Sequence, residues 1–339
     1  MSTRATVKDV AALAGVSPKT VSNVVSGTVP VAPATRARVE DAIVRLGYRP
    51  NASARQLRGG RSGFIGLLVP QLDAPYFGEL VRHHIEAATA LGFTVLVDQT
   101  DGRRERELTL VDGDHPLHLD GLIAATSALT LADLAARRDP TPLVLLGERL
   151  VDAPYDRVSI DDVASARAAT EHLLALGRER IAVIGAGAPD DDAWFGLRAR
   201  GFHEALAAAG RRPPAPDLLV AVDDVRRPDG AAAMRTLLER DERPDAVLAV
   251  NDELALGALR VILEAGLRVP QDIAVAGFDD IADGRFSTPT LTTVAPDKRA
   301  TARAAVSALV ARIAGTAPAE PQRFAPPFEL VVRESTAGT

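Results

Sequence analysis

Lysine, asparagine and serine side chains gather within the segment from Ser17 to Ser26. Lysine can donate to the O6 and N7 acceptors of guanine, and asparagine can pair bidentately with N7 and N6 of adenine. At about 100° per residue, Lys19 and Asn23 project almost opposite a stripe of valines. The spacing therefore predicts a helix whose exposed face carries groups able to read base edges.

A first helix and a tight turn must position this face. Apolar residues at 7, 10, 11 and 14 form one side of a helix, and Gly15 suits the left-handed turn that ends it. Ser17 can cap the second helix, and Pro18 stands at the first helical position, where no N–H is needed. The pattern predicts a helix-turn-helix. An ordinary solvated hairpin is the alternative, because such patterns are short.

Two more helices are predicted before residue 60. Residues 33–46 form an amphipathic helix that stops at Gly47, with an apolar face of Val39, Ala42, Ile43 and Leu46. Asn51 can cap a further helix that reaches only to Arg58, because two glycines follow. A helix this short is marginal alone in water, so we expect it to form only against another surface.

Several runs in this region occur in one register: Thr6-Val-Lys-Asp-Val-Ala, Ala14-Gly-Val-Ser, Thr20-Val-Ser-Asn-Val-Val, and Gly47-Tyr-Arg-Pro-Asn-Ala-Ser-Ala-Arg-Gln-Leu. Together they resemble the lactose-repressor/galactose-repressor (LacI/GalR) family of bacterial transcription regulators. The resemblance implies that the second helix enters the major groove of DNA. It also implies that paired short hinge helices of a dimer enter the minor groove.

The resemblance assigns DNA contacts to ten residues: Ser17, Pro18, Lys19, Thr20, Ser22, Asn23, Asn51, Ala54, Leu57 and Arg58. Ala54 and Leu57 fall on minor-groove positions, and Leu57 would be the apolar wedge that unstacks a base step. Pro18 departs from the family pattern, because proline cannot donate a hydrogen bond. This position can therefore read DNA only by apolar contact or shape.

The charge distribution supports nucleic-acid contact at one end of the chain. The formal net charge is −6, which alone argues against a nucleic-acid partner. Residues 1–61, however, carry ten Lys and Arg against three Asp and Glu, whereas the remainder carries 29 against 42. A basic front on an acidic body is the pattern expected of phosphate contact by the front only.

Other classes of protein receive little support. There is no cysteine, which excludes disulfides and cysteine chemistry. Gly185-Ala-Gly-Ala lacks the third glycine of a dinucleotide motif, and no nucleophile stands with a base. The pairs His83-His84 and His115/His118 lack a third ligand, and we expect them to be solvated. No signal peptide or membrane span is recognisable, so we expect a soluble, cytoplasmic protein that is not an enzyme and has no metal or cofactor.

From Phe64 onward, short apolar runs alternate with amphipathic ones. We expect strands at 65–69, 94–98, 121–125, 143–147, 158–160, 181–185, 218–222, 246–250 and 273–277. Helices are expected at 77–91, 163–176, 197–209, 230–240 and 252–265. The alternation predicts an α/β fold of two halves with parallel sheets covered on both faces. Ligands of such folds bind at the carboxyl ends of strands.

The family resemblance continues through Asn251-Asp-Glu-Leu-Ala, Gly277-Phe-Asp-Asp and Thr288-Pro-Thr-Leu-Thr-Thr-Val. It implies a two-lobed, periplasmic-binding-protein-like (type I) core, with crossings between lobes near Asp161, Thr292 and Phe324. We therefore expect a DNA-binding domain at 1–50, a hinge at 51–62 and an effector-binding and dimerisation domain at 63–339. Its N-lobe would span about 63–161 and 293–323, and its C-lobe about 162–292 and 324–339.

Three polar residues match effector contacts of the family. Arg198 has a planar fork that can span two hydroxyls or a carboxylate. Asp279 follows a predicted strand and can accept from hydroxyls, and Asn251 offers both a donor and an acceptor. Such groups suit polyol recognition in a cleft. The alternatives are surface ions for Arg198 and Asp279, and an ordinary N-cap for Asn251.

Four further residues complete the predicted effector site. Asp73, Tyr76 and Phe77 follow the first core strand, where Phe77 either stacks on a ring or belongs to the core. Trp194, the only tryptophan, either stacks on a sugar face or packs within the protein. Val225 stands where relatives often place an aromatic residue, which leaves the ligand class open.

The resemblance implies a sequence-specific transcriptional regulator, expected to be a repressor. It would bind a palindromic operator in double-stranded DNA as a homodimer, under allosteric control by a small-molecule effector, expected to be a sugar. A nucleoside or purine corepressor is the alternative. An exported solute-binding protein shares the two-lobed core but has no use for a helix-turn-helix.

Overall fold

The computed structural model describes residues 5–26, 29–48, 61–147, 149–150, 152–187 and 194–337. The chain divides into two compact units, Met1–Ser62 and Gly63–Thr339. The predicted hinge residues Asn51, Ala54, Leu57 and Arg58 lie outside the described residues.

The first unit consists of three helices: α1 (Val7–Ala14), α2 (Pro18–Ser26) and α3 (Pro33–Leu46). Thr6 and Asp9 form a capping box at the start of α1, which satisfies two backbone N–H groups that the helix leaves unpaired. Gly15 ends α1 in the left-handed region at φ 64°, where a side chain would be strained. Ser17 Oγ accepts from the Thr20 N–H at 3.1 Å, as expected of an N-cap. Local capping therefore sets these helix ends, at Gly15 and Ser17 as the sequence predicts.

A small apolar core joins the three helices. Its buried members are Val10, Ala11, Ala14, Val21, Val24, Val39, Ala42 and Tyr48. The left-handed turn at Gly47 brings Tyr48 into this core, where the Tyr48 N–H donates to the Ile43 carbonyl at 3.0 Å. Leu46, expected on the buried face, is 37% exposed instead, since the helix ends there and the chain turns.

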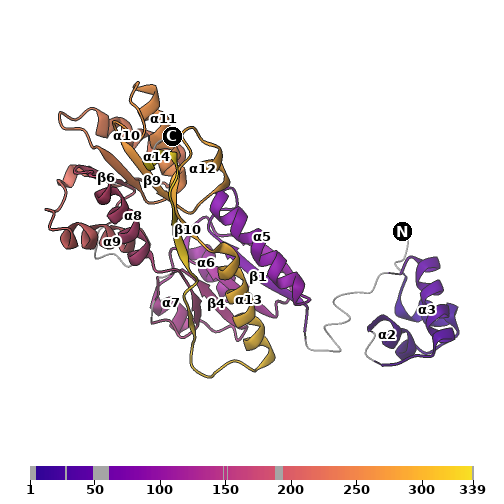
Figure 1. The fold of residues 1–339 in the computed structure, drawn as a ribbon. Coiled ribbons are helices and arrows are strands. Elements are labelled where there is room, and N and C mark those ends of the chain that lie inside the picture. Colours follow the sequence, from indigo (N-terminus) through magenta and orange to yellow (C-terminus); the bar gives the residue numbers. More distant parts are fainter. Residues whose placement is uncertain are drawn as a thin grey trace. The chain divides into compact units, whose positions relative to one another are not determined.

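The second unit contains two six-stranded sheets, each the centre of one lobe (Figure 1). The sheet of the first lobe runs in the order β11-β5-β4-β3-β1-β2, and all its pairs are parallel. Its strands are β1 (Phe64–Val69), β2 (Thr94–Gln99), β3 (Gly121–Ala125), β4 (Leu143–Leu146), β5 (Asp156–Val158) and β11 (Arg323–Phe324). The sheet of the second lobe runs in the order β12-β10-β9-β8-β6-β7, with only the β10–β12 pair antiparallel. Its strands are β6 (Ile181–Ile184), β7 (Leu219–Val220), β8 (Ala246–Ala249), β9 (Ala274–Phe278), β10 (Thr292–Pro296) and β12 (Phe328–Val331).

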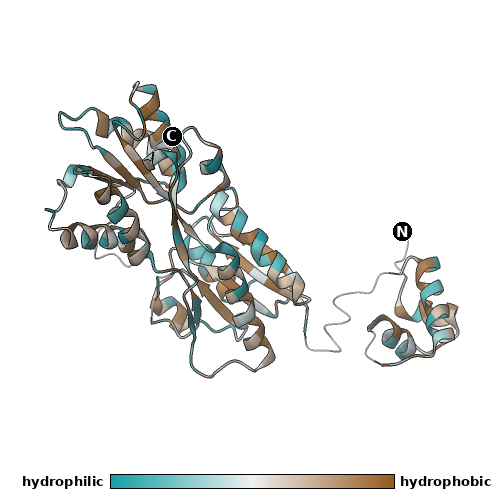
Figure 2. Cartoon of the chain, in the orientation of Figure 1, coloured by the Kyte–Doolittle hydropathy of each residue, from teal (hydrophilic) through white to brown (hydrophobic). Residues whose placement is uncertain are grey.

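Helices cover both faces of each sheet. The first lobe carries α5 (Pro75–Ala90), α6 (Arg104–Val111), α7 (Leu131–Ala136) and α13 (Lys298–Ala314). The second carries α8 (Asp162–Ala175), α9 (Trp194–Ala208), η1 (Pro216–Leu218), α10 (Arg227–Leu238), α11 (Asp252–Glu264), α12 (Ala282–Phe286) and α14 (Glu334–Ala337). In Figure 1, α5 and α13 lie side by side, and both pack on the face of β1 that presents Ile65, Leu67 and Val69. Figure 2 shows the hydrophobic residues following the strands, as buried parallel sheets require.

The crossings between lobes differ in detail from the predicted ones. The first crossing, between β5 and α8, lies where the sequence places it, near Asp161. The second was expected near Thr292, but β10 stays paired with β9 and β12, so the chain crosses only after Pro296. The buried hydroxyl of Thr293 donates to Asp252 at 2.6 Å and helps to hold this strand in the second lobe. The third crossing falls between Phe324 and Phe328.

Candidate nucleic-acid interface and effector site

Helix α2 separates a buried apolar side from an exposed polar side. Val21 and Val24 are buried, whereas Pro18 and Lys19 are exposed and Asn23 is half-buried. The predicted contact residues on this helix therefore share the side that faces away from the core. This arrangement leaves the Lys19 ammonium directed to solvent, where phosphate or base acceptors can reach it.

The hydroxyls on this helix already take part in local hydrogen bonds. Ser17 Oγ caps the helix and lies 2.9 Å from Thr20 Oγ1. Ser22 Oγ donates to the Pro18 carbonyl at 3.0 Å. Ser22 can therefore accept from a base or phosphate partner without breaking that bond, but it must release Pro18 in order to donate.

Arg198 is held rigidly in the second lobe. Its Nε donates to the Asp162 carboxylate at 2.8 Å, and its Nη1 donates to the Val250 carbonyl. The guanidinium carbon lies 3.3 Å from the centroid of the Phe278 ring, which is a stacked cation–π contact. Both Asp162 and Phe278 are buried. The surface-ion interpretation of Arg198 therefore does not hold, because its side chain is only 11% exposed and is fixed on several sides.

Asp279 follows β9 directly, beside the stacked pair. It has φ 109°, and its N–H donates to the Val294 carbonyl at 2.8 Å. Burial raises the pKa of its carboxyl from 3.8 to about 7, although the charges of Arg198 and Lys298 act in the opposite direction. Its carboxyl accepts no hydrogen bond from the described part of the chain. A buried carboxyl in this state is suited to accepting hydrogen bonds from a bound molecule.

Tyr76, from the first lobe, lies near Arg198 and Asp279 of the second lobe. It lies half-buried in the first turn of α5. Burial raises the pKa of its phenol, and the nearby Asp279 carboxylate adds to that effect, so the phenol keeps its proton. Its ring meets that of Phe77 edge-on, with centroids 5.2 Å apart. Phe77 packs against the apolar core of the first lobe, which favours the core interpretation of that residue.

The other predicted effector residues lie differently. Asp73 is exposed, and its carboxylate accepts from Arg226 at 2.7 Å. Asn251 caps α11: its Oδ1 accepts from the Leu254 N–H, and its Nδ2 donates to the Val225 carbonyl, both at 2.9 Å. The N-cap interpretation thus accounts for Oδ1 of Asn251, and the bond to Val225 occupies Nδ2. Trp194 begins α9, and its side chain lies outside the described part of the structure.

Known proteins match both units of the chain. Residues 6–51 match the family described as bacterial regulatory proteins, lacI family, and residues 170–336 match a periplasmic binding protein-like domain. The HTH-type transcriptional regulator CelR of Thermobifida fusca is 36% identical, over 98% of each chain. The chain belongs to the lacI family.

Solved structures of the family agree with the fold. The lac repressor dimer bound to operator and the anti-inducer ONPF is 31% identical, with a TM-score of 0.86 over 98% of this chain and 99% of that one. The complex of the transcriptional regulator CelR with cellobiose is 34% identical, with a TM-score of 0.71 over 98% of this chain and 100% of that one. This lacI-family protein is therefore a DNA-binding transcriptional regulator, and its relatives are regulators rather than enzymes.

Four side chains of this lacI-family regulator that the sequence did not single out stand in the same group: Glu79, Asp162, Phe278 and Lys298. The Lys298 ammonium donates to the Glu79 carboxylate and, at 3.0 Å, to the Asp280 carbonyl. Its ammonium lies 5.7 Å from the centre of the Tyr76 ring. No sequence spacing connects these residues, because they come from four segments that only the fold brings together.

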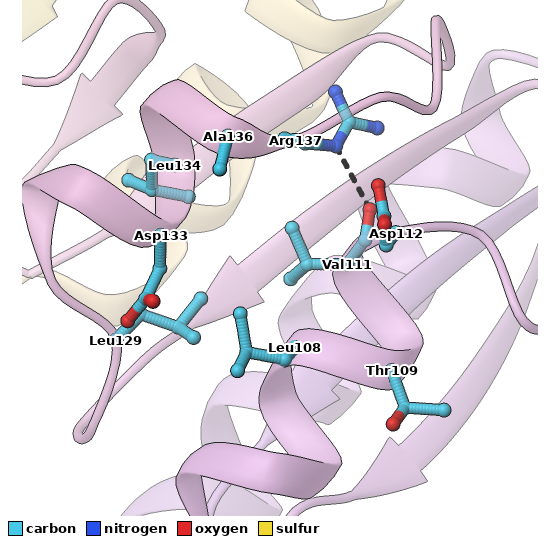
Figure 3. Close-up of a pocket in the computed structure, with 9 residues that line it drawn as sticks. All are labelled: Leu108, Thr109, Val111, Asp112, Leu129, Asp133, Leu134, Ala136 and Arg137. Atoms are coloured by element: carbon cyan, nitrogen blue, oxygen red, sulfur yellow. Dashed lines mark hydrogen bonds between the residues drawn. The ribbon is translucent and has the colours of Figure 1, made fainter.

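A separate surface pocket of about 370 Å³ lies between α6 and α7 of this lacI-family regulator (Figure 3). Its walls are mostly apolar, and none of the predicted effector residues lines it. The charged groups at its rim are occupied: Arg137 donates to the Val111 carbonyl at 2.8 Å, and Asp112 accepts from the Arg138 N–H at the same distance. This pocket therefore offers apolar surface without a free polar group to orient a ligand.

The histidines of this lacI-family regulator are not all solvated as expected. His84 is fully buried on the inner side of α5, where Nδ1 donates to the Leu80 carbonyl at 2.8 Å and burial lowers its pKa to about 4. Within the described ranges, no three His, Cys, Asp or Glu side chains are grouped as metal ligands. None of the described helices has the length and apolar character needed to traverse a lipid bilayer.

Proposed function

We propose that this regulator binds a near-palindromic operator as a homodimer, with α2 of each copy in the major groove. The polar side of α2 above its buried valines supports this role, as does the excess of basic residues at 1–61. The proposed contacts are Ser17, Pro18, Lys19, Thr20, Ser22 and Asn23 in α2 and its turn, and Asn51, Ala54, Leu57 and Arg58 in the hinge. Binding to the bacterial chromosome would place the protein in the cytoplasm, acting as a repressor and not as an enzyme.

We propose residues 1–50 as the DNA-binding domain, 51–62 as the hinge and 63–339 as the effector-binding and dimerisation domain. An effector bound between the lobes would change the spacing of the two hinges in a dimer, and so their helical order on DNA. Coupling of this kind is typically about 1–3 kcal/mol.

The effector is proposed to bind at the group formed by Tyr76, Arg198 and Asp279. The observation that carries this proposal is the Asp279 carboxyl, which is buried beside a fixed guanidinium and accepts no hydrogen bond from the described residues. A ligand hydroxyl would donate to this carboxyl in place of water. The proposed contacts further include Phe77, Trp194 and Asn251, although Asn251 now has other partners. Asp73, also predicted from the sequence as a contact, is paired with Arg226.

The charges favour an uncharged, hydroxyl-rich effector. Arg198 is paired with Asp162, and Lys298 is paired with Glu79, so the nearby cations are already neutralised. A phosphorylated ligand would bring its charge next to Asp279 without a free cation to balance it. A neutral sugar can donate to Asp279 instead, and a sugar is what the CelR complex contains.

A thermal-shift screen tests this site. Cellobiose, ribose, their phosphorylated counterparts and a nucleoside would be added to the full-length protein, since a ligand at 100 times its dissociation constant stabilises by about 2.7 kcal/mol. We expect a neutral sugar to raise the melting temperature of the wild type but not of Asp279→Ala. A shift that survives in Asp279→Ala would move the effector elsewhere.

A binding selection tests the DNA role. Full-length protein would be incubated with fragments of genomic DNA at low and at physiological salt, with and without the stabilising sugar. We expect enrichment of a near-palindromic sequence, lost when residues 1–61 are removed. Absence of any enrichment under all four conditions would overturn the proposed operator binding.

A further inference from the structure

An ion pair joins the two lobes beside the proposed effector site. Asp73 lies in the loop after β1 of the first lobe, and Arg226 lies at the N-cap of α10 in the second. Their side chains meet at 2.7 Å, although the residues are 153 positions apart. The contact can form only when the lobes are close enough on this side, because each residue belongs to a different sheet.

Both partners are anchored within their own lobes. The loop of Asp73 is tied to β2 by the Leu72 N–H, which donates to the Gln99 side chain at 2.9 Å. Arg226 also donates to Glu253 of α11 at 3.3 Å. Each end is therefore attached to the fold of its own lobe, so a formed pair favours the lobe arrangement in which the two ends are close.

The anchor on the second lobe extends over three helices. Glu253 is 13% exposed and accepts from Arg226 and, at 3.1 Å, from Arg227. Arg227 also donates to Asp283 of α12 at 2.9 Å. The first lobe is therefore joined through Asp73 to a chain of alternating charges that crosses α10, α11 and α12.

We propose that the Asp73–Arg226 pair is a strap that holds the lobes together over the effector site. Asp73 then acts on the effector through lobe closure and does not touch it, which revises its predicted role as a contact. The side chain of Asp73 is 76% exposed and is turned toward Arg226, as this role requires. The inference rests on the proposed function only in placing an effector between the lobes.

The Asp73–Arg226 pair lies next to Val225, the residue at which this chain departs from the aromatic side chain common in relatives. Val225 precedes Arg226, and its carbonyl accepts from Asn251. The segment that carries Val225 is thus held by Asn251 on one side and by the strap on the other. Loss of the strap leaves the Asn251 contact intact, so its effect should appear in lobe spacing and not in the local fold.

Spin labels can measure lobe spacing without any effector. The chain has no cysteine, so Leu72→Cys and Asp223→Cys introduce the only two labelling sites, one on each side of the pair. Labelled chains would be diluted with excess unlabelled protein, so that distances within one chain dominate even in a dimer. Distance distributions would be recorded by double electron–electron resonance at 0.05 and 1 M NaCl.

We expect Asp73→Asn and Arg226→Gln each to raise the long-distance population about two- to threefold, as suits an exposed ion pair. The double variant should show no further change, and high salt should open the wild type but not the double variant. Asp272→Asn is the matched control, because it breaks the exposed Arg268–Asp272 pair within the second lobe alone.

Unchanged distributions in both single variants would overturn the strap, whatever binds between the lobes. An equal change in Asp272→Asn would overturn it as well. A shift in the strap variants, with no sugar stabilising the wild type, would uphold the strap and count against the proposed sugar effector alone. Unchanged distributions, together with binding of cellobiose or another sugar to the wild type, would overturn the strap and leave the proposed sugar effector standing.

Discussion

Replacement of Asp279 by asparagine should stabilise the effector-free protein at high pH. The carboxyl has a pKa of about 7 in the folded chain against 3.8 as its ordinary value, because folding buries it. Because the folded-state pKa is raised, the protonated Asp279 carboxyl contributes to the free energy of unfolding. This contribution is fully present below pH 3.8 and is lost as the pH rises through 7. Asparagine has the same shape and stays uncharged, so it avoids this loss.

The size of the effect follows from the two pKa values. Between pH 5 and pH 8.5 the unfolded carboxyl is almost fully ionised, whereas the folded one passes from protonated to ionised. The free energy of unfolding of the wild type should therefore fall by about 2–3 kcal/mol relative to Asp279→Asn over this interval. Asp162 and Asp252 are also buried with raised pKa values and occur in both proteins. The Asp279 charge contributes to the raised pKa of Asp252, so its removal in Asp279→Asn adds to the difference in the same direction.

Urea unfolding of the full-length protein at pH 5, 7 and 8.5 measures this difference, with the transition of residues 63–339 followed by circular dichroism. Asp272→Asn is the control, because hydrogen bonds from Arg268 lower the pKa of Asp272 to about 2, below the whole interval. Its difference from the wild type should not vary with pH. A difference between wild type and Asp279→Asn that also stays constant would refute the burial argument for Asp279.

Four further outcomes are expected. Affinity for the stabilising sugar, measured by calorimetry, should rise by up to roughly tenfold from pH 6 to pH 8, because the ionised Asp279 carboxylate accepts from hydroxyl donors more strongly than the protonated acid does. A flat profile would contradict that role. Gly277→Ala should lower the free energy of unfolding by about 2–4 kcal/mol in urea melts, since the added Cβ would lie 2.2 Å from the Asp252 carboxylate; a neutral effect would mean that Asp252 moves without cost. In quantitative binding assays, Asn23→Ala should cost about 1–3 kcal/mol at one operator base pair and relax its specificity. Lys19→Ala should also reduce the salt dependence of DNA binding if Lys19 contacts phosphate. If both variants lost the same affinity on all DNA sequences, that result would argue against base reading by Asn23.

The sequence by itself determined the first unit. The starts of α1 and α2 and the ends of α1 and α3 follow from a capping box, a serine cap and two left-handed glycines, and each of these acts within four residues of the helix end. Local rules suffice where the stabilising partners are close in the chain. The same holds for the long buried strands of the second unit, whose apolar runs can be recognised without a partner.

The short strands could not be predicted from the sequence, because their stabilising partners lie far away in the chain. Strands β11 and β12 span two and four residues, and β10 is rich in threonine, so none has a distinctive pattern. Their identity as strands depends on neighbours from distant segments, such as β5 for β11. The second crossing, predicted near Thr292, lies after Pro296, because β10 completes its pairing with β9 and β12 first.

The chemistry of the effector site was decided by the tertiary structure. Asp161 and Asp162 are adjacent and identical in type, yet Asp161 caps α8 whereas Asp162 is buried against Arg198. Asp279 and Asp280 differ as sharply. Burial raises the pKa of Asp279, whereas at Asp280 the opposing effect of burial is outweighed by Arg285 and Arg333, which lower the pKa. Residue type and spacing set which side chains are available, but charge and solvation depend on segments that meet only after the chain has folded.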